Sequence, residues 1–140
     1  MIRLSILGAL VAAAGLAAST TASAQGDPSI HGVWRNPKNT VHVEIKPCAA
    51  GACGYVVWAT EKAKRDAREG GTANLVGLQL LRDFSQDKKG LWRGKVFVPD
   101  LNRTFTGIAE LSNPTTLKAK GCFVVLCKSQ TWTRIGAAAD

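Results

Sequence analysis

Two stretches decide the fold of this chain: CAAGAC at residues 48–53 and CFVVLC at residues 122–127. Together they hold all four cysteines of the sequence, in the same C-x4-C spacing. Each stretch lies between two runs of residues that are typical of β-strands. The two stretches therefore mark places where hairpins turn.

An export signal precedes both stretches and covers residues 1–24. Arg3 supplies a positive start, residues 4–18 form an apolar run, and Ala22-Ser23-Ala24 is a small-x-small cleavage motif. The run is shorter than the ~20 apolar residues of a membrane-spanning helix. We expect cleavage after Ala24 and one mature domain over residues 25–140. Such a protein is periplasmic or secreted, and its cysteines meet an oxidising compartment in which disulfides form.

The mature sequence reads as short strands separated by turns. In residues 40–48, Val41, Val43 and Ile45 share one face while polar side chains occupy the other. Turn clusters such as residues 87–90 separate the runs. Residues 61–73 are charged and are compatible with either a short helix or a loop. Strands are expected at residues 31–36, 40–48, 53–60, 78–85, 91–98, 103–111, 116–122 and 128–135.

Consecutive short strands of this kind predict an all-β fold, a single antiparallel up-and-down β-barrel of about eight strands. Closure removes the exposed edges of the sheet, and an open two-layer sandwich is the alternative. Small residues share one face of the later strands, namely Gly94, Gly107, Ala109 and Gly121. If that face points inward, they either leave space for a ligand or relieve crowding in a tight barrel. The sequence leaves both interpretations open.

The order of the turns predicts how the cysteines pair. Successive connections of such a barrel alternate between its two ends, so the second and seventh connections, which hold the cysteines, fall at opposite ends. Disulfides need Cα atoms within about 7 Å, whereas a strand rises ~3.3 Å per residue. We therefore predict Cys48–Cys53 and Cys122–Cys127. The same separation opposes a four-cysteine zinc site, and we expect neither a metal nor a cofactor.

The seventh turn is unusual because residues 123–126 include no polar side chain. It shares its end of the barrel with residues 61–73 and 99–102, and we interpret this end as the mouth. The apolar turn either lines the mouth, packs on its rim, or contacts a membrane surface or a protein partner. The sequence does not assign a face to the other large aromatic residues. The candidate ligand-binding residues are Tyr55, Trp58, Trp92, Phe97, Phe123 and Leu126.

The chain is basic, with 18 Lys and Arg against 10 Asp and Glu and a formal charge of +8. Loss of Arg3 with the signal would leave +7. Positive charge suits anionic lipid heads, other polyanions or an acidic partner, although scattered cations also keep an outer wall soluble. No recognition helix or basic-aromatic repeat supports nucleic-acid binding.

Catalytic residues are not expected. The two histidines are His31 and His42, and His42 shares the polar face of its strand with Glu44. This favours a solvated surface histidine. The sequence contains no nucleophile elbow, HExxH motif, Walker loop or paired-carboxylate motif, so we predict a protein that is not an enzyme.

Residues at the two ends of the mature domain resemble the lipocalin-like (calycin) arrangement. Gly32-Val33-Trp34 opens the first strand and Trp132-Thr133-Arg134 closes the last. The resemblance implies that Arg134 stacks on Trp34 at the closed end, opposite the mouth. Such a cation–π contact contributes roughly 1 kcal/mol.

More closely, the mature sequence resembles the DUF2147 family of small exported bacterial proteins. The resemblance implies a lipocalin-like barrel and leaves the biochemical role undefined. The chain departs from the family pattern at Val98, Asn102 and Phe105, near the predicted mouth. The matching stretches are residues 32–34, 48–58, 92–97, 99–100, 117–122 and 130–134.

Two functions follow as hypotheses. The first is a cell-envelope binder of a small apolar or amphipathic ligand, in which Arg or Lys at the rim meets an anionic head. The alternative is a non-enzymatic protein-interaction or inhibitor module that uses residues 123–126.

Overall fold

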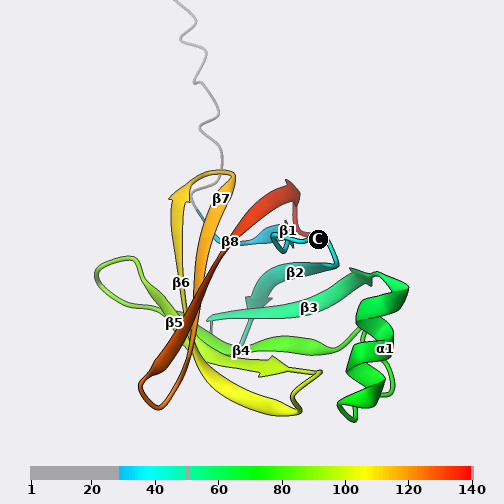
Figure 1. Ribbon diagram of the computed structural model, residues 1–140. Helices are drawn as coiled ribbons and strands as arrows, with labels where there is room; N and C mark the ends of the chain where they lie inside the picture. Colours follow the sequence, from blue (N-terminus) through cyan, green and yellow to red (C-terminus); the bar gives the residue numbers. More distant parts are fainter. Residues whose placement is uncertain (1–28, 50, 140) are drawn as a thin grey trace, which may run out of the picture.

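The chain folds into a closed β-barrel. The computed structural model describes residues 29–49 and 51–139. Eight antiparallel strands follow one another in chain order around the barrel, and the last pairs with the first (Figure 1). The strands are β1 (Gly32–Arg35), β2 (Val41–Cys48), β3 (Gly51–Ala59), β4 (Gln79–Gln86), β5 (Trp92–Val98), β6 (Arg103–Asn113), β7 (Thr116–Phe123) and β8 (Leu126–Gly136).

This architecture confirms the predicted up-and-down barrel and excludes the open sandwich. Connections β2–β3, β4–β5 and β6–β7 share one end with the start of β1 and the end of β8, and we call it the closed end. Connections β1–β2, β3–β4, β5–β6 and β7–β8 share the other end, the mouth. The predicted export signal lies outside the described residues.

Both disulfides form as predicted. Cys48–Cys53 bridges the β2–β3 turn and Cys122–Cys127 bridges the β7–β8 turn, with Cα–Cα distances of 5.8 and 4.1 Å. The two bridges therefore staple opposite ends of the barrel. Because disulfides persist in oxidising compartments, they indicate an exported protein.

The closed end is sealed by Trp34 and Arg134. Trp34 is fully buried (0% exposed), and its indole Nε1 donates to the carbonyl of Ile30 at 2.9 Å. The Arg134 guanidinium lies 4.4 Å from the centre of the Trp34 rings, which is the predicted stacking contact. The same guanidinium donates to the carbonyls of Ser29, His31 and Pro114. It therefore ties the segment before β1 to the β6–β7 turn.

Phe84 of β4 fills the middle of the barrel. Its ring lies so close to β5 and β6 that a Cβ on Gly94 would come within 2.5 Å of it, and a Cβ on Gly107 within 2.8 Å. Phe84 itself is 2% exposed. These two glycines therefore relieve crowding, and the alternative that they leave space for a ligand is wrong at these positions.

The charged segment between β3 and β4 contains a helix, α1 (Glu61–Glu69). Thr60 caps its start, because the threonine Oγ1 accepts the backbone N–H of Ala63 at 3.1 Å. Ala67 of this helix is buried in the core cluster and Ala63 packs against that cluster, so α1 contacts the core through a narrow stripe of two alanines. That stripe is too thin to show in the sequence pattern. Among the described residues, no helix is long and apolar enough to cross a membrane.

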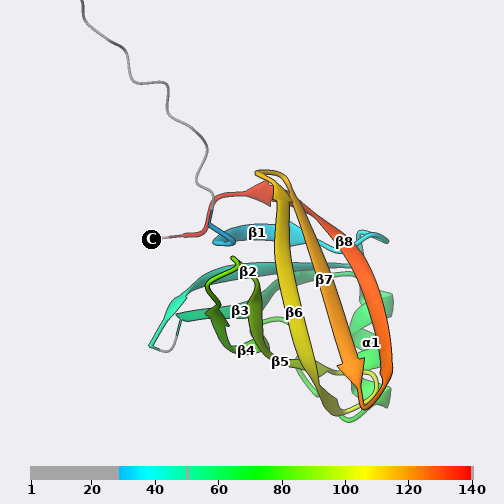
Figure 2. The same cartoon turned by 90° about the vertical axis from the view of Figure 1, so that its left-hand side faces the viewer.

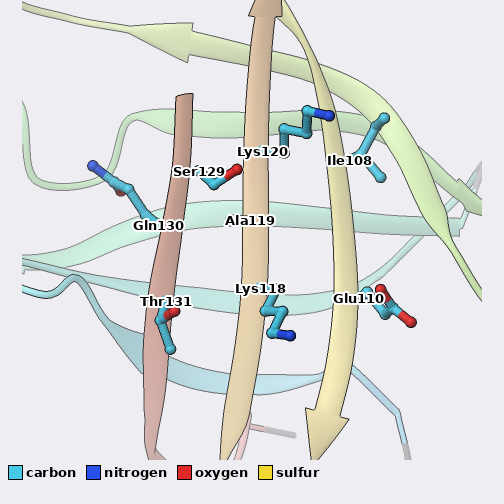
Figure 3. A pocket seen from close by; sticks show the side chains of 8 residues that line it. All are labelled: Ile108, Glu110, Lys118, Ala119, Lys120, Ser129, Gln130 and Thr131. Carbon is cyan, nitrogen blue, oxygen red and sulfur yellow. The ribbon is translucent and has the colours of Figure 1, made fainter. Parts of the chain in front are cut away.

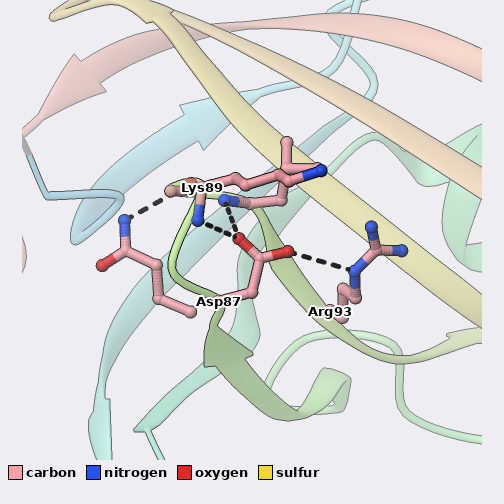
Figure 4. Close-up of polar contacts among 6 residues, drawn as sticks. Asp87, Lys89 and Arg93 are labelled. Carbon is pink, nitrogen blue, oxygen red and sulfur yellow. Dashed lines mark hydrogen bonds and ion pairs between the residues drawn. The ribbon is translucent and has the colours of Figure 1, made fainter.

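The β4–β5 turn shows how tightly the closed end is built (Figure 4). Asp87 Oδ1 accepts the backbone N–H groups of Lys89 and Leu91 at 2.9 and 3.0 Å, and Arg93 Nε lies 3.4 Å from Oδ2. The pKa of Asp87 lies below its usual value, chiefly because the Leu91 N–H favours the carboxylate. One carboxylate thus holds both sides of this turn together.

Candidate functional site on the mouth face

The inner face of β6, β7 and β8 continues past the packed core towards the mouth. In Figure 2 the β7–β8 hairpin runs to the lower end of the molecule, away from the C-terminus. We call the inward-facing residues of this part the mouth face. They are Arg103, Phe105, Gly121, Phe123, Leu126 and Lys128.

Strand register assigns these side chains to the inner face. Val96 packs against the core and is paired with Phe105, so Phe105 points inward and alternation places Arg103 on the same side. Gly121 is paired with Gly107 on one side and with Lys128 on the other. Lys128 therefore shares the inner face, although it is exposed.

Phe123 is held between an aromatic ring and a cation. Its ring centre lies 5.7 Å from that of Phe105 in an edge-to-face arrangement. The Arg103 guanidinium lies 5.7 Å from the same Phe123 ring. Both geometries are favourable for an aromatic ring, so Phe123 is positioned although it is 48% exposed.

Open space lies at the centre of the mouth face. A Cβ on Gly121 would meet no heavy atom within 4 Å, in contrast to the crowded glycines that surround Phe84. Leu126, on the neighbouring strand, is 76% exposed. The inner wall therefore presents an uncovered surface at this end, where apolar and basic side chains are mixed.

The electrostatic character of the mouth face is positive. Arg103 and Lys128 contribute two cations, and within the described residues neither of them forms an ion pair with a carboxylate. Their N–H groups remain available to an acceptor from outside the chain. A surface with two phenylalanine rings, a leucine and two cations suits a molecule that is apolar at one end and anionic at the other.

The candidate aromatic residues divide between the two faces of the barrel. Trp92 lies inside and packs against the core, with the His31 ring 6.4 Å from its own. Phe123 and Leu126 belong to the mouth face. The remaining three, Tyr55, Trp58 and Phe97, lie on the outer wall.

Each outer aromatic residue contacts a polar neighbour. Trp58 stacks on His42 with ring centres 4.4 Å apart, and both face away from the buried Val43 and Val56. The ammonium of Lys46 lies 5.1 Å from the Tyr55 ring, and the guanidinium of Arg82 lies 5.3 Å from the Phe97 ring. These three residues do not contribute to the mouth face.

The two histidines lie far apart in the topology, with His31 at the closed end and His42 near the mouth on the outer wall. The pKa of His42 is lowered, first by its partial burial and second by the positive charge of Arg35 on the neighbouring strand. His42 Nε2 lies 2.7 Å from Asn39 Oδ1. His42 therefore belongs to a small polar cluster at the β1–β2 turn.

A second hollow, of about 350 Å³, lies on the outer wall of β6, β7 and β8 (Figure 3). Lys118 and Lys120 project from β7, and Lys118 is paired across the sheet with Glu110. This acid partly offsets the basic charge, so the hollow is less suited to an anion than the mouth face. Its lining residues are Ile108, Glu110, Lys118, Ala119, Lys120, Ser129, Gln130 and Thr131.

Sequence reasoning found only part of the mouth face. Phe123 and Leu126 drew attention because they lie in an apolar turn. Arg103 and Lys128 did not, because charged residues in strands are normally assigned to the outer wall. Alternation along β8 could have indicated that Lys128 faces inward, because Lys128 and Trp132 lie four positions apart and so share a face.

Comparison with known proteins gave one finding. Residues 32–134 match the model of a family described as "Uncharacterized protein conserved in bacteria (DUF2147)". No curated protein and no solved structure matches the chain. The matched segment begins at the first residue of β1 and ends at Arg134, so it contains the whole mouth face.

Proposed function

The chain belongs to the DUF2147 family, and since the description of that family names no activity, we propose a function from the geometry of the mouth face. The protein is a non-enzymatic binding protein of the bacterial cell envelope, periplasmic or secreted. It holds a small amphipathic anion against the inner wall of β6, β7 and β8. The observation that carries this proposal is the open space at Gly121, bordered by aromatic rings and by two cations that form no ion pair within the part of the chain that the structure describes.

The apolar part of the ligand would contact Phe105, Phe123 and Leu126. Phe123 and Leu126 expose much of their apolar surface to water, so covering them with a hydrocarbon chain is favourable. Burial contributes about 0.8 kcal/mol per methylene. A single alkyl chain therefore supplies enough free energy for binding without a deep cavity.

The anionic head would be bound by Arg103 and Lys128. Arginine presents a planar fork of N–H donors that matches a carboxylate or phosphate, while lysine acts as a point charge. The Arg103 guanidinium lies over the Phe123 ring, and this contact restricts the position of the guanidinium. Restricting the donor before binding lowers the entropy lost on binding.

Phe84 limits how deep the ligand can lie. Because this ring occupies the space beside Gly94 and Gly107, the closed half of the barrel is filled by the chain itself. The proposed site therefore lies at the mouth, and the question of a hollow or a filled interior, which the sequence left open, is answered beside Phe84 by a filled one. It suits a slender single-chain molecule better than a bulky one.

The proposal is tested by measuring the binding of dodecanoate with titration calorimetry and native mass spectrometry. Dodecanol, which has the same chain and no charge, is the matched probe. We expect Gly121→Leu to abolish binding of both molecules because the new side chain occupies the open space. We expect Lys128→Gln to weaken dodecanoate about fivefold, the value of a single exposed charge pair, and to leave dodecanol unchanged.

Lys120→Gln is the control, since it removes the same charge from the outer face of β7 and should change neither affinity. Equal dodecanoate affinity of the Gly121→Leu variant and the unaltered protein would contradict the proposal. So would the absence of binding by the unaltered protein to dodecanoate and to a lysophospholipid.

A further inference from the structure

The turn between β7 and β8 is the most exposed apolar part of the described chain. Val124 is 83% exposed and Val125 is 87% exposed, and they are the two residues between the paired Phe123 and Leu126. We call Val124 and Val125 the tip. An apolar side chain contributes to the free energy of folding when it is buried. Val124 and Val125 remain exposed in the folded chain, so their apolar character does not stabilise the fold.

Backbone conformation supports the same conclusion. Four described residues other than glycine have positive φ: Asn39, Asp83, Asn102 and Val124. The first three are residue types that tolerate this region, whereas a β-branched valine at φ 54° is an outlier. When the first residue of a two-residue hairpin turn has a positive φ, that residue is normally glycine. Strain of this kind concentrates at functional sites.

Cations lie on both strands of the hairpin behind the tip. Lys128 lies two residues beyond Leu126, roughly 7 Å along the strand, and Lys120 lies three residues before Phe123, roughly 10 Å along it. They occupy opposite faces of the hairpin, because Lys128 is paired with Gly121 on the inner face and Lys120 is the next residue. Arg103 adds a third cation above Phe123.

The hairpin end is also braced. The Cys122–Cys127 disulfide links the two strands immediately behind Phe123 and Leu126, and Phe123 packs edge-on against Phe105. A covalent bond and an aromatic contact therefore restrict the strands that carry the tip. Less conformational entropy is lost when a rigid apolar projection is immobilised than when a flexible loop is.

We propose that the tip inserts into the surface of a bilayer that contains anionic phospholipids. Interfacial protein segments bury their apolar residues about 5–10 Å into the boundary between headgroups and acyl chains. When the tip lies at that depth, Lys128 and Lys120 follow it along the two strands, and their long side chains can reach the phosphates. Arg103, which lies beside the Phe123 ring, adds a third cation near them. When a hairpin inserts into a membrane, anionic headgroups lie on every side of it, and basic residues on both faces of the hairpin suit that arrangement. A protein partner would need a pocket that encloses the hairpin to contact both faces.

This inference goes beyond the proposed ligand site and does not depend on it. Membrane docking would place the mouth face beside the lipid, where an amphipathic molecule leaves or enters the bilayer. Either property can nevertheless fail without the other, because Val124 and Val125 lie beyond the last strand pair, Phe123 and Leu126, and no heavy atom lies within 4 Å of a Cβ at Gly121.

The test uses the mature, disulfide-bonded protein in vesicle flotation. Vesicles consist of phosphatidylcholine alone or of phosphatidylcholine with phosphatidylglycerol. We expect flotation with the anionic vesicles, and its loss as salt is raised. The decisive variant combines Val124→Gly with Val125→Asn, which gives the turn a sequence that its backbone favours. We expect vesicle affinity to fall at least tenfold while the thermal midpoint stays equal or rises.

Ile135→Asn is the matched control, because it removes a half-exposed apolar side chain at the closed end and should leave flotation unchanged. Lys120→Gln should weaken binding to anionic vesicles only. Undiminished flotation of the Val124→Gly/Val125→Asn variant overturns the proposal. It is also overturned if the unaltered protein floats with neither kind of vesicle; binding of a protein partner through the tip would then assign the tip to that partner. Dodecanoate binding, measured on the same variant, should be unaffected and shows separately whether the ligand site holds.

Discussion

Two halves of one barrel place the same residue type in opposite surroundings. At Gly94 and Gly107 a single added carbon would collide with the Phe84 ring, whereas at Gly121 it would meet nothing. Gly107 and Gly121 are even direct partners across β6 and β7. The boundary between a filled core and an open wall therefore passes between two paired residues.

This contrast separates the half that stabilises the fold from the half in which we propose that a ligand binds. The closed half holds the largest buried side chains, Trp34 and Phe84, and the arginine that donates to three carbonyls. The mouth half presents exposed apolar and basic side chains on strands that the closed half keeps in register. Because strands β6 to β8 run through both halves, the mouth can carry residues that contribute little to folding.

The largest difference in stability between the two halves is expected when a phenylalanine of each half is replaced by alanine. Phe84→Ala removes a ring that is 2% exposed and leaves a cavity, so we expect a loss of about 3–5 kcal/mol in the free energy of unfolding. Phe123→Ala removes a ring that is 48% exposed, and we expect less than about 1 kcal/mol. Urea denaturation of both variants measures the difference. Equal losses would mean that the mouth half also belongs to the core.

Arginine replacement gives the next largest effect. Arg134→Met leaves the carbonyls of Ser29, His31 and Pro114 without this donor, and we expect a loss of about 2–4 kcal/mol. Arg103→Met should cost no more than about 0.5 kcal/mol, because an exposed cation near a ring contributes little. Thermal denaturation compares the two. A large loss for Arg103→Met would show that this residue supports the barrel and is not reserved for a ligand.

Replacing a glycine by alanine adds one carbon atom and so tests the boundary between the filled core and the open wall. Gly94→Ala should cost about 1–3 kcal/mol, since its Cβ would press on the Phe84 ring and on the carbonyl of Arg82. Gly121→Ala should be neutral or stabilise by up to about 1 kcal/mol, because it removes a flexible residue from a strand and meets no neighbour. Chemical denaturation of both variants decides the point, and destabilisation by Gly121→Ala would indicate that the space is already filled.

The sequence predicted the frame of the molecule better than its site. Alternation and turn residues were enough to order the strands, and the parity of the turns then fixed both disulfides. Those signals are local, or depend only on chain order. Whether a glycine is crowded depends on Phe84, which reaches across from another strand, so neither local signal distinguishes Gly107 from Gly121.

The faces of the aromatic residues were hidden for a related reason. The pairing of β2 with β3 shifts between His42 and Val43, and that of β4 with β5 shifts between Arg82 and Ser85. A shift of one residue exchanges the two faces of a strand, so alternation cannot be extended through it from the sequence. Trp58 lies beside the first shift, and its outward position follows only from the observed pairing.

The smallest expected effect concerns pH and the outer wall near the mouth. Burial and Arg35 lower the pKa of His42 below its usual 6.5, so the unfolded chain binds a proton more readily than the folded one. The stability that this histidine contributes is present above about pH 6.5 and is lost as the pH falls through the lower, folded pKa. Titration of the His42 ring by NMR should give a midpoint below 6.5, and Arg35→Ala should raise it.

His42→Gln is the control for stability, since it should reduce the difference in urea midpoint between about pH 8 and about pH 5. A normal midpoint for His42 would show that the Trp58 stack and Arg35 do not disfavour the charged ring. The polar cluster at the β1–β2 turn would then tolerate the protonated form. If the His42 midpoint is lowered and Arg35→Ala leaves it unchanged, the whole decrease in pKa is due to burial against Trp58. The mouth half would then contain at least one contact that excludes water.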